Sequence, residues 1–255
     1  MPWTPSHAAA ILPFRRLCPK YLSFPALVAG AVAPDMAYYV GRSDISEFAH
    51  TFAGSIVVCV PTGLLSLLIF FLVRRPLWFL LPQPHRGAVE PLVAKRPVMN
   101  GPAILAATAS IVIGAWTHVV WDSFTHSSTW IVSRVDLLRE SWRLGSIEAY
   151  GFTVLQDLST LVGAAALTMA YLEWLRKQPR PLAGKSGSDG WRYIALLGAV
   201  LTSAAIATSM ALDASAAAQA PTRMVVVQAA FYGGSTFAVL LLAYSAGYFL
   251  LRNKP

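Results

Sequence analysis

The chain has 255 residues, of which 56% are hydrophobic and only 13% are charged, and its mean hydropathy is +0.54. Soluble domains carry about 25% charged residues, so this composition excludes an ordinary soluble domain and indicates an all-α, polytopic helical membrane bundle. The net charge of +8 does not indicate a nucleic-acid-binding protein, because the basic residues form short clusters between apolar runs. The two cysteines form no motif, which argues against a disulfide framework.

Residues 1–40 contain two short apolar stretches and allow two arrangements. If residues 21–40 cross the membrane, Asp35 and His7 lie on opposite sides. If residues 5–16 and 24–35 form a re-entrant hairpin, His7 and Asp35 lie on the same side. As α-helices these stretches are about 17 Å long, too short to span the membrane. The basic residues Arg15, Arg16 and Lys20 favour the crossing, whereas the chemistry of His7 and Asp35 favours the hairpin, which we prefer.

Beyond residue 50 the chain holds five apolar runs that are long enough to cross a membrane. Each provides the ~20 residues that an α-helix needs to cross about 30 Å of hydrocarbon. They are Thr51–Val73, Pro102–Trp121, Phe152–Leu175, Trp191–Leu212 and Met224–Leu251. The sequence therefore predicts a single integral membrane domain over residues 1–255, with five to six transmembrane helices and a short N-terminal helical hairpin over residues 1–40.

The distribution of basic residues predicts how these spans are oriented. Twelve lysines and arginines lie in the 74–101 connection, the 176–192 connection and the C-terminal tail, against five in the connections on the opposite side. Because cytoplasmic loops carry the excess of basic residues, the connections over 76–101 and 176–190 and the C-terminus are expected to be cytoplasmic. The outer 123–151 connection mixes tryptophans with arginines, which is typical of a segment at the membrane interface, either a passive connector or a substrate lid.

The clearest candidate site lies where the second long apolar run ends, in Gly114–Ser127. His118 and Asp122 are four residues apart and share one face of a helix. His126 follows four residues later, about 12 Å from His118 on a continuous helix, so either the helix ends near Asp122 or two ions bind. Imidazole and carboxylate are ligands that zinc selects. Ionisable groups are rare in membrane segments unless they bind something, because burying them in hydrocarbon is costly.

Further ionisable residues at the ends of apolar segments complete a candidate ligand set. His7, Asp35 and His50 fall on the side of Asp122 if the N-terminal residues form the hairpin. Gln156 and Asp157, near the start of the next span, are candidates for an outer shell or an extra ligand. Two alternatives without a metal remain: a buried polar network that locks helices together, and a proton or ion path.

Several short motifs, taken together, resemble a bacterial inner-membrane family known only as domain of unknown function 4184. They are Thr4-Pro5-Ser6-His7, Ala33-Pro34-Asp35, His50-Thr51, His118-x-x-x-Asp122 and Leu155-Gln156. Their order is also similar to that in membrane-bound metal-dependent hydrolases and, more distantly, in zinc-dependent phospholipase C and P1-type nucleases. This resemblance implies a location in the bacterial inner membrane and metal ligands at His7, Asp35, His50, His118 and Asp122, with His126 matching the next histidine.

The sequence departs from those soluble enzymes at two places. Their late histidine and acid pair is represented only by Gln156 and Asp157, and Trp3 is not at the N-terminus as their ligating tryptophan is. We therefore expect one or two divalent ions, most simply zinc, instead of three. The first hypothesis is a membrane-embedded hydrolase that acts on a phosphoester or lipid at the outer face, with membrane lipids as its partners. The alternative is a non-enzymatic membrane protein whose His/Asp cluster is structural or conducts ions.

Overall fold

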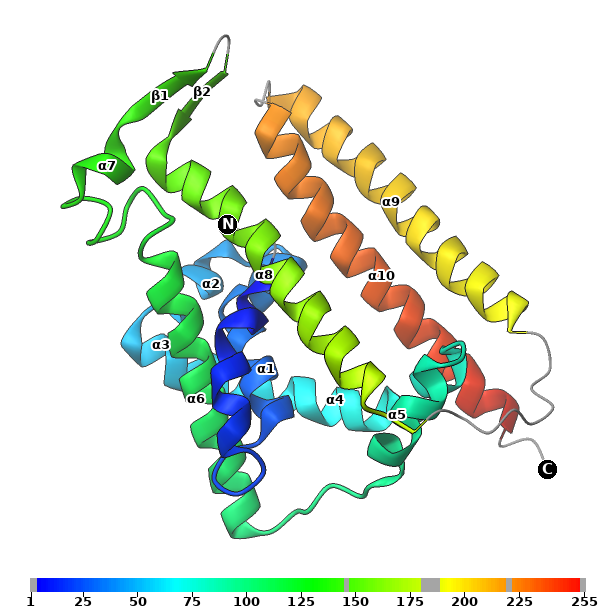
Figure 1. The fold of residues 1–255 in the computed structure, drawn as a ribbon. Helices are drawn as coiled ribbons and strands as arrows, with labels where there is room; N and C mark the ends of the chain where they lie inside the picture. Colours follow the sequence, from blue (N-terminus) through cyan, green and yellow to red (C-terminus); the bar gives the residue numbers. More distant parts are fainter. Residues whose placement is uncertain (1–3, 145–146, 180–188, 219–221, 253–255) are drawn as a thin grey trace. The chain divides into compact units, whose positions relative to one another are not determined.

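The computed structural model describes residues 4–144, 147–179, 189–218 and 222–252. It is almost entirely helical, which confirms the predicted all-α class (Figure 1). The chain forms two compact units, one made of Met1–Leu67 with Met99–Leu172 and the other of Leu68–Val98 with Glu173–Pro255. The first unit contains all six residues predicted as metal ligands, which are His7, Asp35, His50, His118, Asp122 and His126.

Within the described residues, five helical stretches are long and apolar enough to cross a membrane, in agreement with the prediction. They are Phe52–Leu80 (helices α3, Phe52–Val57, and α4, Cys59–Leu80), Gly101–Asp122 (α6), Gly151–Arg176 (α8), Gly190–Ala214 within α9 (Gly190–Ala218) and Val225–Leu251 within α10 (Thr222–Arg252). The first stretch continues past the predicted end at Val73, through Arg74 and Arg75. Hydropathy marks where apolar surface ends, whereas the helix continues for as long as its backbone hydrogen bonds do.

The N-terminal residues form a hairpin of short helices. Helix η1 (Thr4–Leu17) is wound as a 3₁₀-helix, α1 (Phe24–Val32) is an α-helix, and η2 (Ala33–Val40) is again 3₁₀. A 3₁₀-helix rises about 2.0 Å per residue, so the 14 residues of η1 extend about 28 Å. The segment is therefore considerably longer than an α-helix of the same residues would be.

Helices η1 and α1 lie beside α6 (Figure 1). Two glycines let the backbones of α1 and α6 touch. A Cβ at Gly30 would lie 2.2 Å from the carbonyl oxygen of Ile111, and one at Gly114 would lie 2.3 Å from that of Leu27. A cluster of buried apolar side chains fills the space between η1, α1 and α6. It consists of Ile11, Leu22, Leu27 and Ala31.

The two helices run in the same direction, as two contacts at their ends show. Ser23 N donates to Ser110 Oγ over 2.9 Å near the start of α1, and Ala31 O lies 2.8 Å from His118 Nδ1 near its end. This register places the end of α1 and the start of η2 beside the last turns of α6, where the candidate ligands lie.

A tight connection between α2 (Ser43–Ala49) and α3 positions His50. Thr51 caps α3 by accepting a hydrogen bond from Gly54 N over 3.0 Å. Gly54 is required here, because a Cβ at this position would lie 1.8 Å from the carbonyl oxygen of Phe48. Beyond α6, the connection to α8 contains the short α7 (Asp136–Arg139) and an antiparallel hairpin of β1 (Ser141–Leu144) and β2 (Ile147–Tyr150), which the sequence analysis did not predict.

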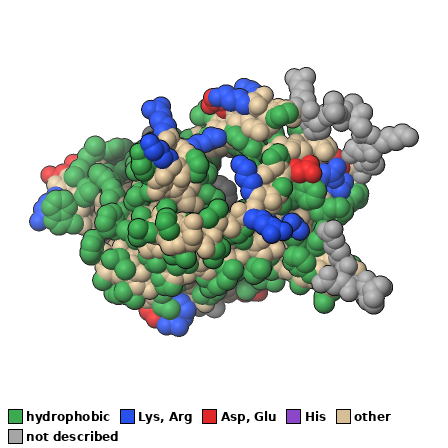
Figure 2. All heavy atoms as spheres, turned by 90° about the horizontal axis from the view of Figure 1, so that it is seen from below, with side chains coloured by type: hydrophobic (Ala, Val, Ile, Leu, Met, Phe, Trp, Pro, Cys, Tyr) green, Lys and Arg blue, Asp and Glu red, His purple; other side chains and the backbone are tan. Residues whose placement is uncertain are grey.

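The second unit contains α5 (His85–Ala94), α9 and α10, of which α9 and α10 pack side by side. Asp189 accepts hydrogen bonds from Gln83 N and Arg192 Nη1, which holds the segment before α5 against the start of α9. The surface drawn in Figure 2 is mostly hydrophobic, with Lys and Arg in separate groups, as expected for a protein embedded in a bilayer.

Candidate metal centre

Four of the predicted ligands meet at one buried point. Asp35 comes from η2, His50 follows α2, and His118 and Asp122 come from successive turns of α6. One potential ligand atom from each lies within 4.8 Å of the corresponding atoms of the other three. The side chains of Asp35, His118 and Asp122 are buried, and that of His50 is 22% exposed. The cluster is therefore closed on most sides and reached past His50.

Five of the six distances between these atoms are nearly equal. His50 Nε2, His118 Nε2 and Asp122 Oδ2 lie 3.3 Å from one another. Asp35 Oδ1 lies 3.6 Å from His50 Nε2 and 3.5 Å from His118 Nε2. The ligands of a tetrahedral zinc ion, with bonds of about 2.0–2.1 Å, lie about 3.3–3.4 Å apart. These five distances are close to the edges of a tetrahedral coordination shell, and the two carboxylate oxygens lie within 4.8 Å of each other.

Two backbone carbonyls fix the protonation of the histidines. His50 Nδ1 lies 2.7 Å from Ser46 O, and His118 Nδ1 lies 2.8 Å from Ala31 O. A carbonyl oxygen only accepts hydrogen bonds, so both Nδ1 atoms carry hydrogen, and each ring presents a lone pair at Nε2 when it is neutral. Carbonyl acceptors behind ligating histidines are the usual outer shell of a metal site.

The carboxylates also lack donors on the side that faces the cluster. Asp35 Oδ2 accepts a hydrogen bond from Thr4 Oγ1 over 2.8 Å, but Asp35 Oδ1 and both oxygens of Asp122 are buried without a hydrogen-bond partner in the described part of the chain. Unpaired buried oxygens are costly. The two Nε2 atoms lie 3.3 Å apart, and a single proton could be bonded to only one of them. One divalent cation could be bound by both Nε2 atoms and by both carboxylates.

His7 lies beside this group instead of within it. Its Nε2 is 3.4 Å from Asp122 Oδ1, and its ring stacks on His118 with centroids 3.7 Å apart.

Of the remaining predicted residues, His126 lies at the edge of the site, and Gln156 and Asp157 are not part of the four-residue cluster. His126 Nδ1 lies 3.7 Å from Asp122 Oδ2 and 3.1 Å from the backbone oxygen of the same residue, and its side chain is 31% exposed. On α8, Gln156 is buried and Asp157 is exposed, so the two point in different directions. The hydroxyls of Thr51, Thr117 and Ser123 donate to backbone carbonyls three residues earlier in their own segments.

Sequence reasoning missed two residues that orient the ligands. Thr4 was recognised only as part of a motif, and Ser46 was not singled out. Ser46 contributes its backbone oxygen to His50, and its hydroxyl donates to Pro34 O over 2.9 Å, beside Asp35. The only available signal was their position three or four residues before a histidine.

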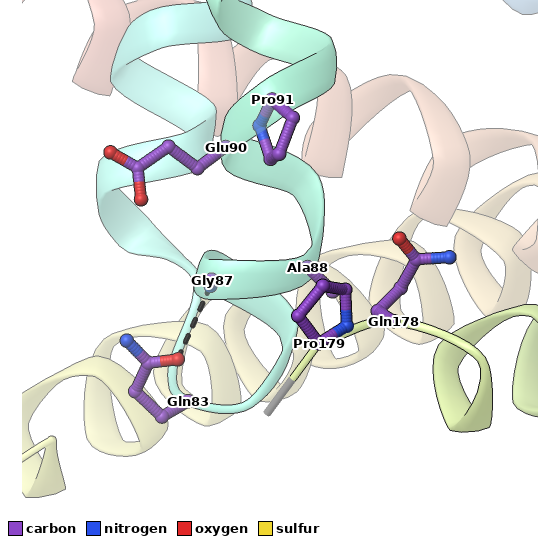
Figure 3. A pocket seen from close by; sticks show the side chains of 7 residues that line it. All are labelled: Gln83, Gly87, Ala88, Glu90, Pro91, Gln178 and Pro179. Carbon is purple, nitrogen blue, oxygen red and sulfur yellow. Dashed lines mark hydrogen bonds between the residues drawn. The ribbon is translucent and has the colours of Figure 1, made fainter. Parts of the chain in front are cut away.

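The described part of the chain contains other cavities, but no second group of three or more metal-ligating side chains. A cavity of about 260 Å³ in the second unit is lined by residues including Gln83, Glu90 and Gln178, and Gln83 Oε1 accepts a hydrogen bond from Gly87 N at its edge (Figure 3). Glu90 is the one ionisable residue of that lining, which does not make a metal site.

Comparison with known proteins gives a family without a known activity. No curated protein and no solved structure is significantly similar to the chain. One family model matches residues 1–246 and therefore includes every candidate ligand. The chain belongs to the family described as "Domain of unknown function (DUF4184)".

Proposed function

We propose that this protein is a membrane-embedded, zinc-dependent hydrolase, with Asp35, His50, His118 and Asp122 holding one ion. The observation that carries the proposal is the convergence of two imidazole Nε2 atoms and two carboxylate oxygens, with N···O and N···N distances of 3.3–3.6 Å and both Nδ1 atoms turned to backbone carbonyls. A zinc ion in this position would polarise a substrate oxygen and lower the pKa of a bound water towards ~7.

The surrounding residues would position the ligands and transfer protons. His50 and His118 are held rigidly by the carbonyls of Ser46 and Ala31, so the ligand atoms need little rearrangement on binding. His126 lies at the partly exposed mouth. If its Nδ1 donates to Asp122 O, its Nε2 is available to exchange a proton with water or a leaving group.

The surroundings of the mouth support an amphipathic substrate. Phe48 and Phe52, on either side of His50, are 44% and 72% exposed, and Phe52 stacks on the exposed Trp116 of α6 at 5.6 Å. Tryptophan side chains such as Trp116 are enriched where a bilayer meets water, and the two exposed phenylalanines add apolar surface beside it. A phosphoester of a membrane lipid fits this setting, since the phosphate would reach the ion while the acyl chains remain in the membrane. The distribution of basic residues supports placing the mouth on the outer side, with the C-terminus in the cytoplasm.

The test compares hydrolysis with and without zinc. Detergent-solubilised protein should hydrolyse a fluorogenic phospholipid, lose this activity when a chelator removes zinc, and regain it when zinc is added. Asp122→Asn should abolish the activity, whereas Asp157→Asn, an exposed acid on α8, should retain it. Equal turnover in the zinc-loaded and zinc-free proteins would contradict the proposal.

The number of ligands favours one second candidate. Zinc sites with four protein ligands are usually structural, whereas catalytic sites keep a position for water. In that case the ion would join η2, α2 and α6, and its removal would lower the melting temperature of a protein without hydrolase activity. Cobalt substitution separates the two candidates, because a water ligand makes the absorption spectrum depend on pH and on added phosphate.

A further inference from the structure

The first turn of η1 reaches both acids of the candidate metal centre. In a 3₁₀-helix the side chains at positions i and i+3 lie one above the other. Thr4 and His7 have this spacing and are both buried. Ser6, between them, packs closely on α8, because a Cβ at Gly163 would lie 2.8 Å from Ser6 O. The turn is therefore held against the site by the helices around it.

Thr4 determines which oxygen of Asp35 is available to an ion. Its hydroxyl donates to Oδ2 over 2.8 Å. The other oxygen, Oδ1, is left facing the Nε2 atoms of His50 and His118. A hydrogen bond to one oxygen of a carboxylate orients the other towards its metal.

His7 has the same relation to Asp122. Its Nε2 lies 3.4 Å from Asp122 Oδ1, and neither atom has another hydrogen-bond partner in the described part of the chain. Asp122 Oδ2 instead faces His50 and His118 at 3.3 Å. A single cation bound to Asp35 Oδ1 and Asp122 Oδ2, with His7 Nε2–H donating to Asp122 Oδ1, would leave none of these buried atoms unpaired.

We propose that Thr4 and His7 are positioning residues, which orient the two carboxylates for one ion, and that His7 does not ligate the ion itself. This inference rests on the metal site of the proposed function, but it does not require that the protein be a hydrolase. It also means that zinc binding and the docking of the N-terminal helix stabilise each other, because the same turn contacts both acids.

The test measures zinc affinity by chelator competition in the full-length protein. Thr4→Val removes the hydroxyl at nearly constant volume, and His7→Phe keeps the stacked ring without a donor. Each should weaken zinc binding by about 10–100-fold and leave the number of ions per chain unchanged. Thr4→Ser should restore the affinity. Thr168→Val is the matched control, because Thr168 is an exposed residue that donates only to its own helix, at Ala164 O.

X-ray absorption of the zinc-loaded protein adds a readout that a loss of stability would not change. It should show two imidazole ligands in both the wild type and His7→Phe. Three imidazoles in the wild type and two in the variant would make His7 a ligand and overturn the inference. Unchanged zinc affinity in Thr4→Val would also overturn the inference. If His7→Phe does not fold, the zinc affinity of Thr4→Val is the deciding measurement. A wild type that binds no zinc would instead contradict the proposed function itself.

Discussion

At the scale of single residues, two backbone oxygens determine what the candidate centre can bind. Ser46 O and Ala31 O each take the Nδ1–H of a histidine, so the lone pairs of His50 and His118 face the two carboxylates. A polar network that only locks helices together would place donors opposite acceptors. Here the Nε2 atoms and the carboxylate oxygens lie 3.3–3.6 Å apart, longer than most hydrogen bonds. This spacing favours a bound cation over a simple hydrogen-bonded network.

The charge of Asp35 should be essential to zinc binding. Asp35→Asn keeps the size of the side chain and the hydrogen bond from Thr4, but it removes one of the two negative charges that balance the divalent ion. We expect zinc affinity to fall more than about 100-fold, beyond the range typical of outer-shell changes. Chelator competition measures this effect, with Asp157→Asn as the control. A change of less than about threefold in Asp35→Asn would show that this carboxylate is not a ligand.

The site was partly predictable at this scale, and the limits have physical reasons. His118 and Asp122 follow from helical spacing alone, because residues four apart share a face. Asp35 and His50 could be added only by motif order and by their places at segment ends. The contact of Thr4 with Asp35 depends on the 3₁₀ winding of η1, which local sequence does not determine.

At the scale of elements, the contact between α1 and α6 determines the geometry of the site. Gly114 permits it, because a Cβ there would lie 2.3 Å from Leu27 O and 2.8 Å from Ala31 N. The same contact brings Ala31 O to His118 Nδ1. Helix packing through glycine is common in membranes, where small residues let backbones approach closely.

Gly114→Ala should therefore disturb both stability and metal binding. The added methyl group must push α1 away from α6, which costs about 1–3 kcal/mol by analogy with overpacked cores and lengthens the contact between His118 and Ala31. Thermal melting in detergent and zinc affinity measure the two effects. Gly101→Ala is the control, since a Cβ there meets nothing within 4 Å. If the two variants melt together and bind zinc equally, the close approach is not important.

The element that the sequence analysis described least well is η1. The length expected for residues 5–16 assumed the rise of an α-helix, about 1.5 Å per residue. As a 3₁₀-helix the 14 residues Thr4–Leu17 extend about 28 Å, close to the thickness of the hydrocarbon core. His7 lies beside Asp122 and on the same side as Asp35, as the hairpin arrangement requires. The length of η1 nevertheless lets Arg15 and Arg16 extend towards the opposite surface.

At the scale of the whole molecule, the five apolar helices are the feature that the sequence predicted best. A long apolar run in a bilayer can adopt few structures other than a helix, because only helices and closed barrels satisfy the hydrogen bonds of the backbone there. The β1–β2 hairpin was missed because it lies in the connection between α6 and α8, where no apolar run marks its strands.

The orientation of the molecule can be tested with thiol labelling. Cys18 lies just beyond η1, at the turn of the N-terminal hairpin, and is partly exposed, whereas Cys59 is buried. A membrane-impermeant maleimide should leave Cys18 unlabelled in intact cells and label it in inside-out vesicles. Ser128→Cys, in the outer connection, should show the opposite pattern in a Cys18→Ser background. Labelling of Cys18 in intact cells would reject the orientation or the length assigned to η1.

The central claim is that this protein binds a divalent metal ion at Asp35, His50, His118 and Asp122, and elemental analysis tests it most directly. Purified wild-type protein should contain about one zinc per chain, and His118→Ala combined with Asp122→Ala should contain none. His85→Ala combined with Asp157→Ala changes the same residue types outside the cluster and should retain the ion. A folded wild-type protein that takes up no zinc, even after zinc is added, would contradict the account.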